Sequence, residues 1–164
     1  MEISRLNETT ILIARIDPVI AELLRRIIPS ADPGDNEKAR ARIFSAPTQD
    51  PEEDHFAEDW REYIEPGLAR LFQSALEVIE GDLQRMHPDP ATGEATVSFP
   101  SDHLEQWIHG LNQARLVLSE RHKLNEDEID PETLPASDPR AFLLLQLHLY
   151  AQLQLLFLRL LDAR

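Results

Sequence analysis

His103, Glu105 and His109, in the first half of the segment HLEQWIHGLNQARLVLSERH (residues 103–122), have side chains of the types that bind metal ions. Imidazole nitrogens and carboxylate oxygens are common zinc ligands. Glu105 and His109 are four residues apart, which places them on one face of a helix, and His103 precedes them. The same spacing also suits a hydrogen-bonded surface pair. Because no further ligand accompanies these residues, we expect no metal site. The alternative is a metal site formed by His103, Glu105 and His109.

Other motifs for catalysis or cofactor binding are incomplete. Glu52 and His55 have the Glu-x-x-His spacing of di-iron helical bundles, but such a site needs the motif twice. The acidic stretch 126–130 lacks the glycine and the ligand spacing of a calcium-binding hand. The sequence has no glycine-rich phosphate loop, no nucleophile-elbow pattern and no cysteine. We therefore expect neither a catalytic residue nor a cofactor.

A polar stripe beside the apolar face of segment 103–122 contains Asn112 and Arg115. Arg115 lies close enough to the apolar face to be partly buried, so its guanidinium needs a carboxylate or backbone carbonyls. Asp82 is the candidate partner, because it falls within the apolar stripe of its own helix and would otherwise be an unpaired buried charge. The sequence therefore predicts a structural clasp between Asp82 and Arg115. The alternative is a ligand site formed by Asn112, Arg115, Asp82 and Trp107.

Helical periodicity over most of the chain supplies the framework for these residues. Asp17 and Asp138 each precede a proline, which is typical of an N-cap followed by proline in the first turn. The stretch 30–50 contains prolines and a glycine and is expected to be a connection. We predict a mainly α, single-domain bundle over residues 1–164, with about five helices, a small N-terminal β-hairpin and a third short strand in the segment ATVSF. The hairpin is expected at 2–16 and the helices at 18–28, 52–64, 66–86, 102–123 and 139–162.

The last predicted helix is apolar on two faces. The broad face contains Phe142, Leu145, Leu149, Tyr150, Leu153, Leu156, Phe157, Leu160 and Leu161, and the second stripe contains Leu144, Leu147, Ala151, Leu155 and Leu158. Gln146 falls inside the broad face, where it needs hydrogen-bond partners. His148, Gln152 and Arg159 share an edge that we expect to meet water. Other helices of the same chain would cover most of the second stripe, or a homodimer through this helix would cover it.

The composition limits the partners and the location of the protein. Its 30 acidic and 16 basic residues give a net charge of -14, which argues against binding to nucleic acid. No stretch of 18 residues in the last helix lacks Gln, His and Arg, so we expect no membrane span. Residues 1–18 lack the basic start and the long apolar run of a secretory signal. The sequence therefore predicts a cytoplasmic protein.

A recognisable pattern in the segment 107–121 comprises Trp107, Ile108, Leu111, Asn112, Arg115, Leu116, Val117, Leu118 and Arg121. This pattern resembles the signature helix of DUF2017, an uncharacterised bacterial family. The strand leading into Asp17 and Pro18, the segment 42–44 and the leucine-rich last helix also resemble this family, so the similarity spans most of the chain. Gln113 and Ser119 depart from the pattern, which has an acidic residue and a glycine there.

The resemblance implies a fold and little chemistry, because the family has no assigned activity. Members of the family look like neighbours, in gene order, of the adaptor of the Clp protease. We therefore expect an interaction or regulatory protein without catalytic activity, associated with Clp-type proteolysis and with a protein partner that the sequence does not identify. The alternative is a metal-binding or enzymatic helical domain that uses His and Glu side chains.

Overall fold

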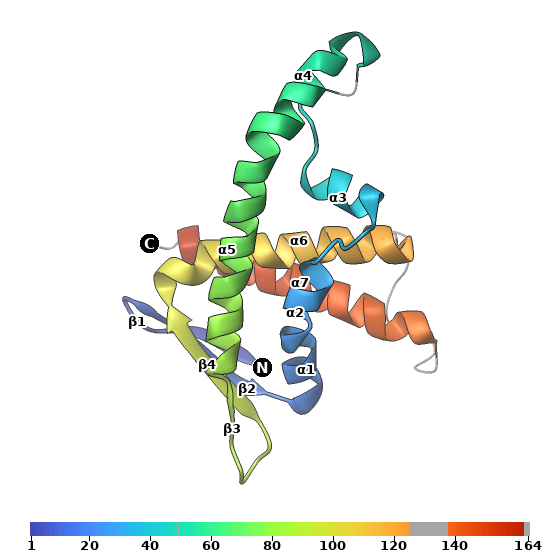
Figure 1. Ribbon diagram of the computed structural model, residues 1–164. Helices are drawn as coiled ribbons and strands as arrows, with labels where there is room; N and C mark the ends of the chain where they lie inside the picture. Colours follow the sequence, from blue (N-terminus) through green and yellow to red (C-terminus); the bar gives the residue numbers. More distant parts are fainter. Residues whose placement is uncertain (49, 125–137, 163–164) are drawn as a thin grey trace.

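The computed structural model describes residues 1–48, 50–124 and 138–162, and it shows a mainly α protein with a small sheet at one side of the helices (Figure 1). The strands are β1 (Glu2–Asn7), β2 (Thr10–Ile16), β3 (His87–Pro88) and β4 (Ala95–Pro100). The helices are α1 (Pro18–Arg25), α2 (Ile27–Ala31), α3 (Glu37–Ile43), α4 (Asp54–Asp59), α5 (Glu65–Gln84), α6 (Leu104–His122) and α7 (Pro139–Asp162). The short turns are η1 (Pro51–Glu53), η2 (Trp60–Ile64) and η3 (Ser101–His103). The predicted fold class is confirmed.

The sheet is antiparallel, with strand order β1-β2-β4-β3. The predicted hairpin is the β1–β2 pair, and the predicted third strand, β4, pairs with β2. Ile11 lies opposite Phe99, and Ile13 lies opposite Val97, and all four side chains are buried. Because alternate residues of a strand face the same side, β2 and β4 present one apolar face to the helices.

Two predicted boundaries in the first part of the chain are wrong. The helix expected over 18–28 ends at Arg25 and is followed by the short helix α2. The stretch 30–50, expected to be a connection, contains α3. The side chain of Asn36 caps this helix by accepting a hydrogen bond from the backbone N–H of Ala39. Phe44, directly after α3, stacks on Phe72 of α5 with ring centroids 5.6 Å apart, and this contact attaches the short helix to the body.

The helices predicted at 52–64 and 66–86 are joined, because α4, η2 and α5 follow one another without a break. A proline inside a helix normally interrupts it, since its ring meets the carbonyl four residues earlier. Here η2 is a π-helical segment that immediately precedes α5, and the N–H of Glu65 donates to the carbonyl of Trp60, five residues earlier. The wider turn accommodates Pro66. The result is a rod whose α4 end extends away from the rest of the molecule (Figure 1).

The helix α6 lies at the centre of the helical body, where it packs against α2, α3, α5 and α7. Its closest approach to α5 is at Gly110, which has no side chain. A Cβ atom at this position would lie 2.3 Å from the Cδ1 atom of Ile79 and 3.3 Å from the Cδ2 atom of Leu76. Both of these side chains are buried. An alanine at position 110 would therefore force the buried side chains of Ile79 and Leu76 to shift.

The helix α7 packs on α6 through one side only. Gln146 is buried, as expected, and its Nε2 donates to Ser30 Oγ and to Tyr150 Oη, each at 2.8 Å. Tyr150 Oη in turn donates to the carbonyl of Leu23 at 2.7 Å. These bonds connect α7 to α1 and α2, and they satisfy polar groups that would be costly to bury alone.

The expected burial of the two apolar faces of α7 is only partly correct. In the second stripe, Leu144 and Leu147 are buried, but Leu155 and Leu158 are exposed. In the broad face, the exposed residues are Phe142, Leu145 and Leu156. His148, Gln152 and Arg159 meet solvent as predicted. The burial is only partial because the other described helices contact α7 from one side and do not surround it.

Within the described part of the chain, a single helix has the length and composition of a membrane span, at Arg140–Asp162. This is weak evidence for a membrane, because an apolar helix of a soluble protein passes the same test. Its hydrogen-bonded Gln146 and Tyr150 attach it to the helical body, so the structure is consistent with a soluble protein.

Gly110→Ala should destabilise the fold by roughly 1–3 kcal/mol, the usual cost of overpacking, although alanine favours the helix by itself. Gly81→Ala is the matched control in α5, where a Cβ atom meets nothing within 4 Å. The control should raise the free energy of unfolding by up to about 1 kcal/mol. Denaturant unfolding measures both. If the two variants changed the free energy of unfolding in the same direction, this result would contradict the close packing of α5 on α6 at Gly110.

The two tyrosines should ionise differently in alkaline solution. Burial raises the pKa of Tyr150, so its phenol stays neutral in the folded protein above about pH 10, the ordinary pKa of tyrosine. The stabilisation that comes from burying the neutral phenol of Tyr150 is complete below that pH, and it is lost as the pH rises further. Tyr63 is exposed, although a hydrogen bond to Glu62 raises its pKa. Absorbance of tyrosinate should therefore show one reversible step from Tyr63 and a second step that coincides with unfolding.

Tyr150→Phe is the control for this titration. The variant should lose the step that coincides with unfolding and keep the reversible one. Reversible ionisation of both tyrosines in the folded protein would contradict the burial of Tyr150.

Candidate functional site

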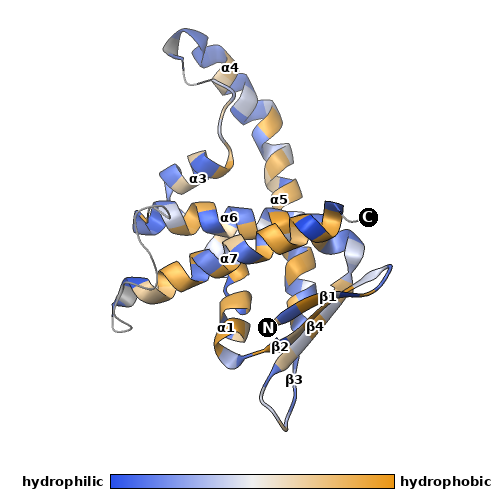
Figure 2. Ribbon diagram, turned by 180° about the vertical axis from the view of Figure 1, so that it is seen from behind, coloured by the Kyte–Doolittle hydropathy of each residue, from blue (hydrophilic) through white to orange (hydrophobic). Residues whose placement is uncertain are grey.

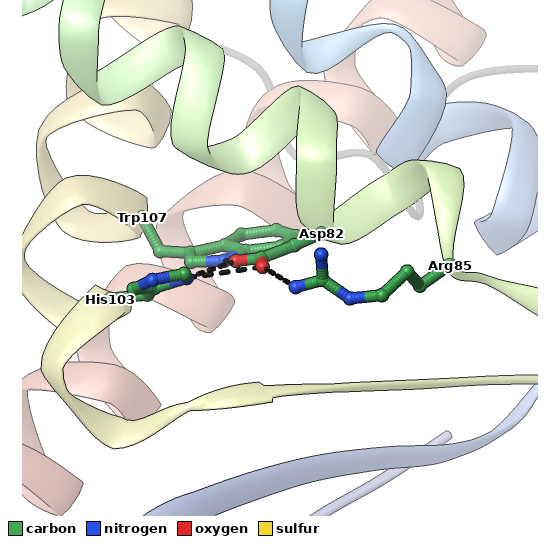
Figure 3. A network of polar contacts seen from close by, with 4 residues as sticks. All are labelled: Asp82, Arg85, His103 and Trp107. Atoms are coloured by element: carbon green, nitrogen blue, oxygen red, sulfur yellow. Dashed lines mark hydrogen bonds and ion pairs between the residues drawn. The ribbon is translucent and has the colours of Figure 1, made fainter.

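The carboxylate of Asp82 is the centre of a polar network between the end of α5 and the start of α6 (Figure 3). Asp82 has no solvent exposure. Trp107 Nε1 donates to its Oδ2 atom at 2.8 Å, and Nδ1 of His103 lies 3.0 Å from the same oxygen. Arg85, one turn later in the chain, forms an ion pair with Oδ1. The buried charge is thus compensated by a guanidinium and by two further side chains.

Two members of this network reach the surface. Arg85 is exposed and His103 is half-buried. Both line a shallow hollow together with Thr9 of the β1–β2 turn, Thr10 of β2 and the segment 98–102. A catalytic triad contains a carboxylate that orients a histidine, and a nucleophile that is hydrogen-bonded to the same imidazole. Asp82 and His103 have the arrangement of the first two members. The side-chain hydrogen bonds of His103 in the described structure go to Asp82. The network joins the end of α5 to the start of α6.

The predicted pairing of Asp82 with Arg115 is wrong. Nη1 of Arg115 donates to Oε1 of Gln154 at 2.8 Å, so Arg115 connects α6 to α7 and not to α5. Trp107 does reach Asp82, whereas Asn112 is exposed on another side of α6. Arg85 was missed as a partner, although its position three residues after Asp82 in a helix could have indicated it.

The residues of the alternative metal site do not come together. His103 turns toward Asp82, while Glu105 and His109 are exposed, and the ring of His109 lies beside Phe72 at 6.5 Å. Within residues 1–48, 50–124 and 138–162, no group of three His, Asp or Glu side chains has an arrangement that could hold a metal ion. The structure thus offers no support for this alternative.

A second candidate site lies on the arm formed by α4 and η2. We define the aromatic arm surface by five residues that line one shallow hollow: Pro47, Phe56, Trp60, Tyr63 and Ile64. Phe56 is 52% exposed and Tyr63 is 68% exposed. The spacing of three and four residues between these side chains predicted a helix. It could not show that the apolar side of this helix is exposed. The structure shows that the stripe has little to pack on.

Carboxylates surround the aromatic arm surface. Residues 50–65 contain a single arginine, Arg61, and eight acidic residues, which are Asp50, Glu52, Glu53, Asp54, Glu58, Asp59, Glu62 and Glu65. Glu53 and Asp59 line the hollow itself. In addition, Nε1 of Trp60 is buried and has no acceptor among the described residues. The surface therefore combines apolar contact area with negative charge.

Asp82→Ala should destabilise the protein by about 3 kcal/mol, because the buried indole N–H of Trp107 loses its acceptor and Arg85 loses its ion pair. The matched control is Glu80→Ala, which removes an exposed carboxylate from the same helix and should change stability by less than about 0.5 kcal/mol. Thermal or denaturant unfolding measures the difference. Equal stabilities of the two variants would show that the network does not hold α5 to α6.

A comparison with protein families gives one match, to the family described as Domain of unknown function (DUF2017), over residues 7–161. No match was found among curated proteins or among solved structures. The match includes α5, α6 and α7, and with them the Asp82 network and the aromatic arm surface. Since the matched region spans nearly the whole chain, the protein belongs to the DUF2017 family.

Proposed function

We propose that this protein is a cytoplasmic interaction module without catalytic activity, and that it binds a partner protein through the aromatic arm surface. The observation that supports this proposal most directly is the exposure of Phe56, Tyr63 and Ile64 on a helix that extends away from the core. Large exposed apolar patches are rare on soluble monomers and commonly mark interaction sites. Aromatic side chains are also enriched among the residues that dominate binding energy.

The charge around the surface specifies the chemistry of the partner. Glu53 and Asp59 border the aromatic side chains, and the arm as a whole is strongly acidic. A basic amphipathic segment fits best, because its apolar side would cover Phe56 and Tyr63 while Lys or Arg side chains meet the carboxylates. Such charge complementarity accelerates association and selects partners, and it weakens as salt is added.

A regulatory role in Clp-type proteolysis is the more specific form of this proposal. Members of the family look like gene-order neighbours of the Clp protease adaptor, and this adaptor is therefore the first partner to test. A module that binds without catalysis would suit a role in presenting or restraining another protein. The shape of the arm supports this role, because it offers a binding surface at a distance from the helical body (Figure 1).

Replacing Phe56 and Tyr63 by serine should weaken binding of the partner by roughly thirtyfold or more, which corresponds to ~2 kcal/mol for loss of a binding hot spot. Affinity capture on the immobilised full chain, followed by titration of the purified captured protein and of the Clp adaptor, measures this effect. Binding should also weaken with rising ionic strength.

Leu6→Ser is the matched control, because Leu6 is an exposed apolar residue of β1 far from the arm in the sequence. It should leave the affinity unchanged. The proposal is refuted if the double arm variant and the Leu6 variant bind every captured protein equally well.

A further inference from the structure

We propose that two copies of this chain associate through the exposed face of α7, side by side and antiparallel, about a two-fold axis. The α7 seam comprises six exposed residues: Leu145, His148, Gln152, Leu155, Leu156 and Arg159. Leu145 is 40% exposed and Leu155 is 44% exposed. Figure 2 shows α7 lying on the outside of the helical body, with much of its ribbon in the colour of hydrophobic residues.

The exposed leucines of the α7 seam do not belong to the hydrophobic core. The opposite side of α7 supplies the contacts to the rest of the molecule: Phe157 packs on Trp107 of α6, Tyr150 bonds to α1 and Gln146 bonds to α2. Leu145 and Leu155 are not among the buried core of the described residues. Three leucines exposed on one side of a helix, Leu145, Leu155 and Leu156, point to a surface that covers them.

Charge favours a second copy as the occupant of the seam. Between Arg140 and Leu161 the helix has no carboxylate, whereas the whole chain has a net charge of -14. Contact through acidic surfaces such as the arm would bring like charges together, which is costly at an interface. The face of α7 is thus a part of the surface where two identical acidic chains can meet with little repulsion.

The spacing of the seam suits the pairing of two helices. Leu145, His148, Gln152, Leu155 and Arg159 follow at alternating intervals of three and four residues, which is the spacing of the contact positions in a two-helix coiled coil, with leucine at two of the five positions. A two-fold contact is isologous, so each residue that touches the partner is itself touched by an equivalent residue.

The antiparallel direction follows from the identity of the seam residues. In a parallel pair each side chain meets its own copy, so the two Arg159 guanidiniums would face each other. In an antiparallel pair centred near Tyr150, Leu145 of one copy lies opposite Leu155 of the other, and His148 lies opposite Gln152. Apolar residues then meet apolar residues and polar residues meet polar residues. Antiparallel helices also avoid alignment of their dipoles.

The test is the mass of the full chain in solution, measured by light scattering and sedimentation equilibrium over a range of concentrations. The wild-type protein should reach the mass of a dimer, and Leu155→Asp should shift it to a monomer with an unchanged circular dichroism spectrum. The side chain at 155 is exposed in the single chain, so this variant is expected to fold. Leu71→Asp, at an exposed apolar position of α5, is the matched control and should remain a dimer.

A charge-pair variant tests the direction of the helices. Leu145→Lys combined with Leu155→Asp should restore the dimer that Leu155→Asp alone abolishes, because the antiparallel contact places the new cation opposite the new anion. Failure to restore it would overturn the antiparallel register.

Three results would overturn the association itself. These are a wild-type protein that is monomeric at every concentration, a dimer that survives Leu155→Asp, and a monomer that binds vesicles of anionic phospholipid through the same leucines. The last result would assign the α7 seam to a lipid surface. None of these measurements depends on the partner of the aromatic arm surface.

Discussion

A fully buried carboxylate, that of Asp82, limits how the main helices of this protein can pack. Asp82 needs donors for both of its oxygens, and these come from its own helix end, from the turn before α6 and from α6 itself. Each donor has to stay within hydrogen-bond distance, so the end of α5 and the start of α6 are held in one relative position. The turn that contributes His103 follows β4 directly, and the sheet is thereby attached to the same point. Because α6 then contacts α2, α3 and α7, its placement determines most of the helical body.

Much of this fold could be predicted from the sequence, because the patterns that produced it are local. Asp17 before Pro18 indicated the start of α1, and the alternation in the segment ATVSF indicated β4. The burial of Asp82 and the need of Gln146 for partners were also predictable, since both polar residues lie within apolar helical stripes.

The partners of the buried groups could not be predicted in the same way. Helical spacing says which side of a helix a residue occupies but not which neighbour lies there, so Arg115 was assigned to Asp82 although it reaches Gln154. The same limit applies to exposure. The apolar spacing of Phe56 and Tyr63 is equal to that of a core-facing helix, and only the position of α4 beyond the body shows that the stripe is at the surface. A short capped helix such as α3 is difficult to recognise, because seven residues make only about two turns and show little periodicity.

The π-helical segment η2 has a consequence for how the arm evolves. A π turn contains about one residue more than an α turn, and each residue of an α-helix advances the chain by about 100° around the axis. The residues before η2 are therefore rotated relative to those after it, compared with an uninterrupted helix. Deleting one residue from Trp60–Ile64 would restore the α-helical phase and turn the side chains of α4, including Phe56, to a different side of the rod, without changing the part of α5 that packs on α6. A single-residue insertion or deletion is thus a simple route by which relatives could change the direction that the arm faces while their core stays the same.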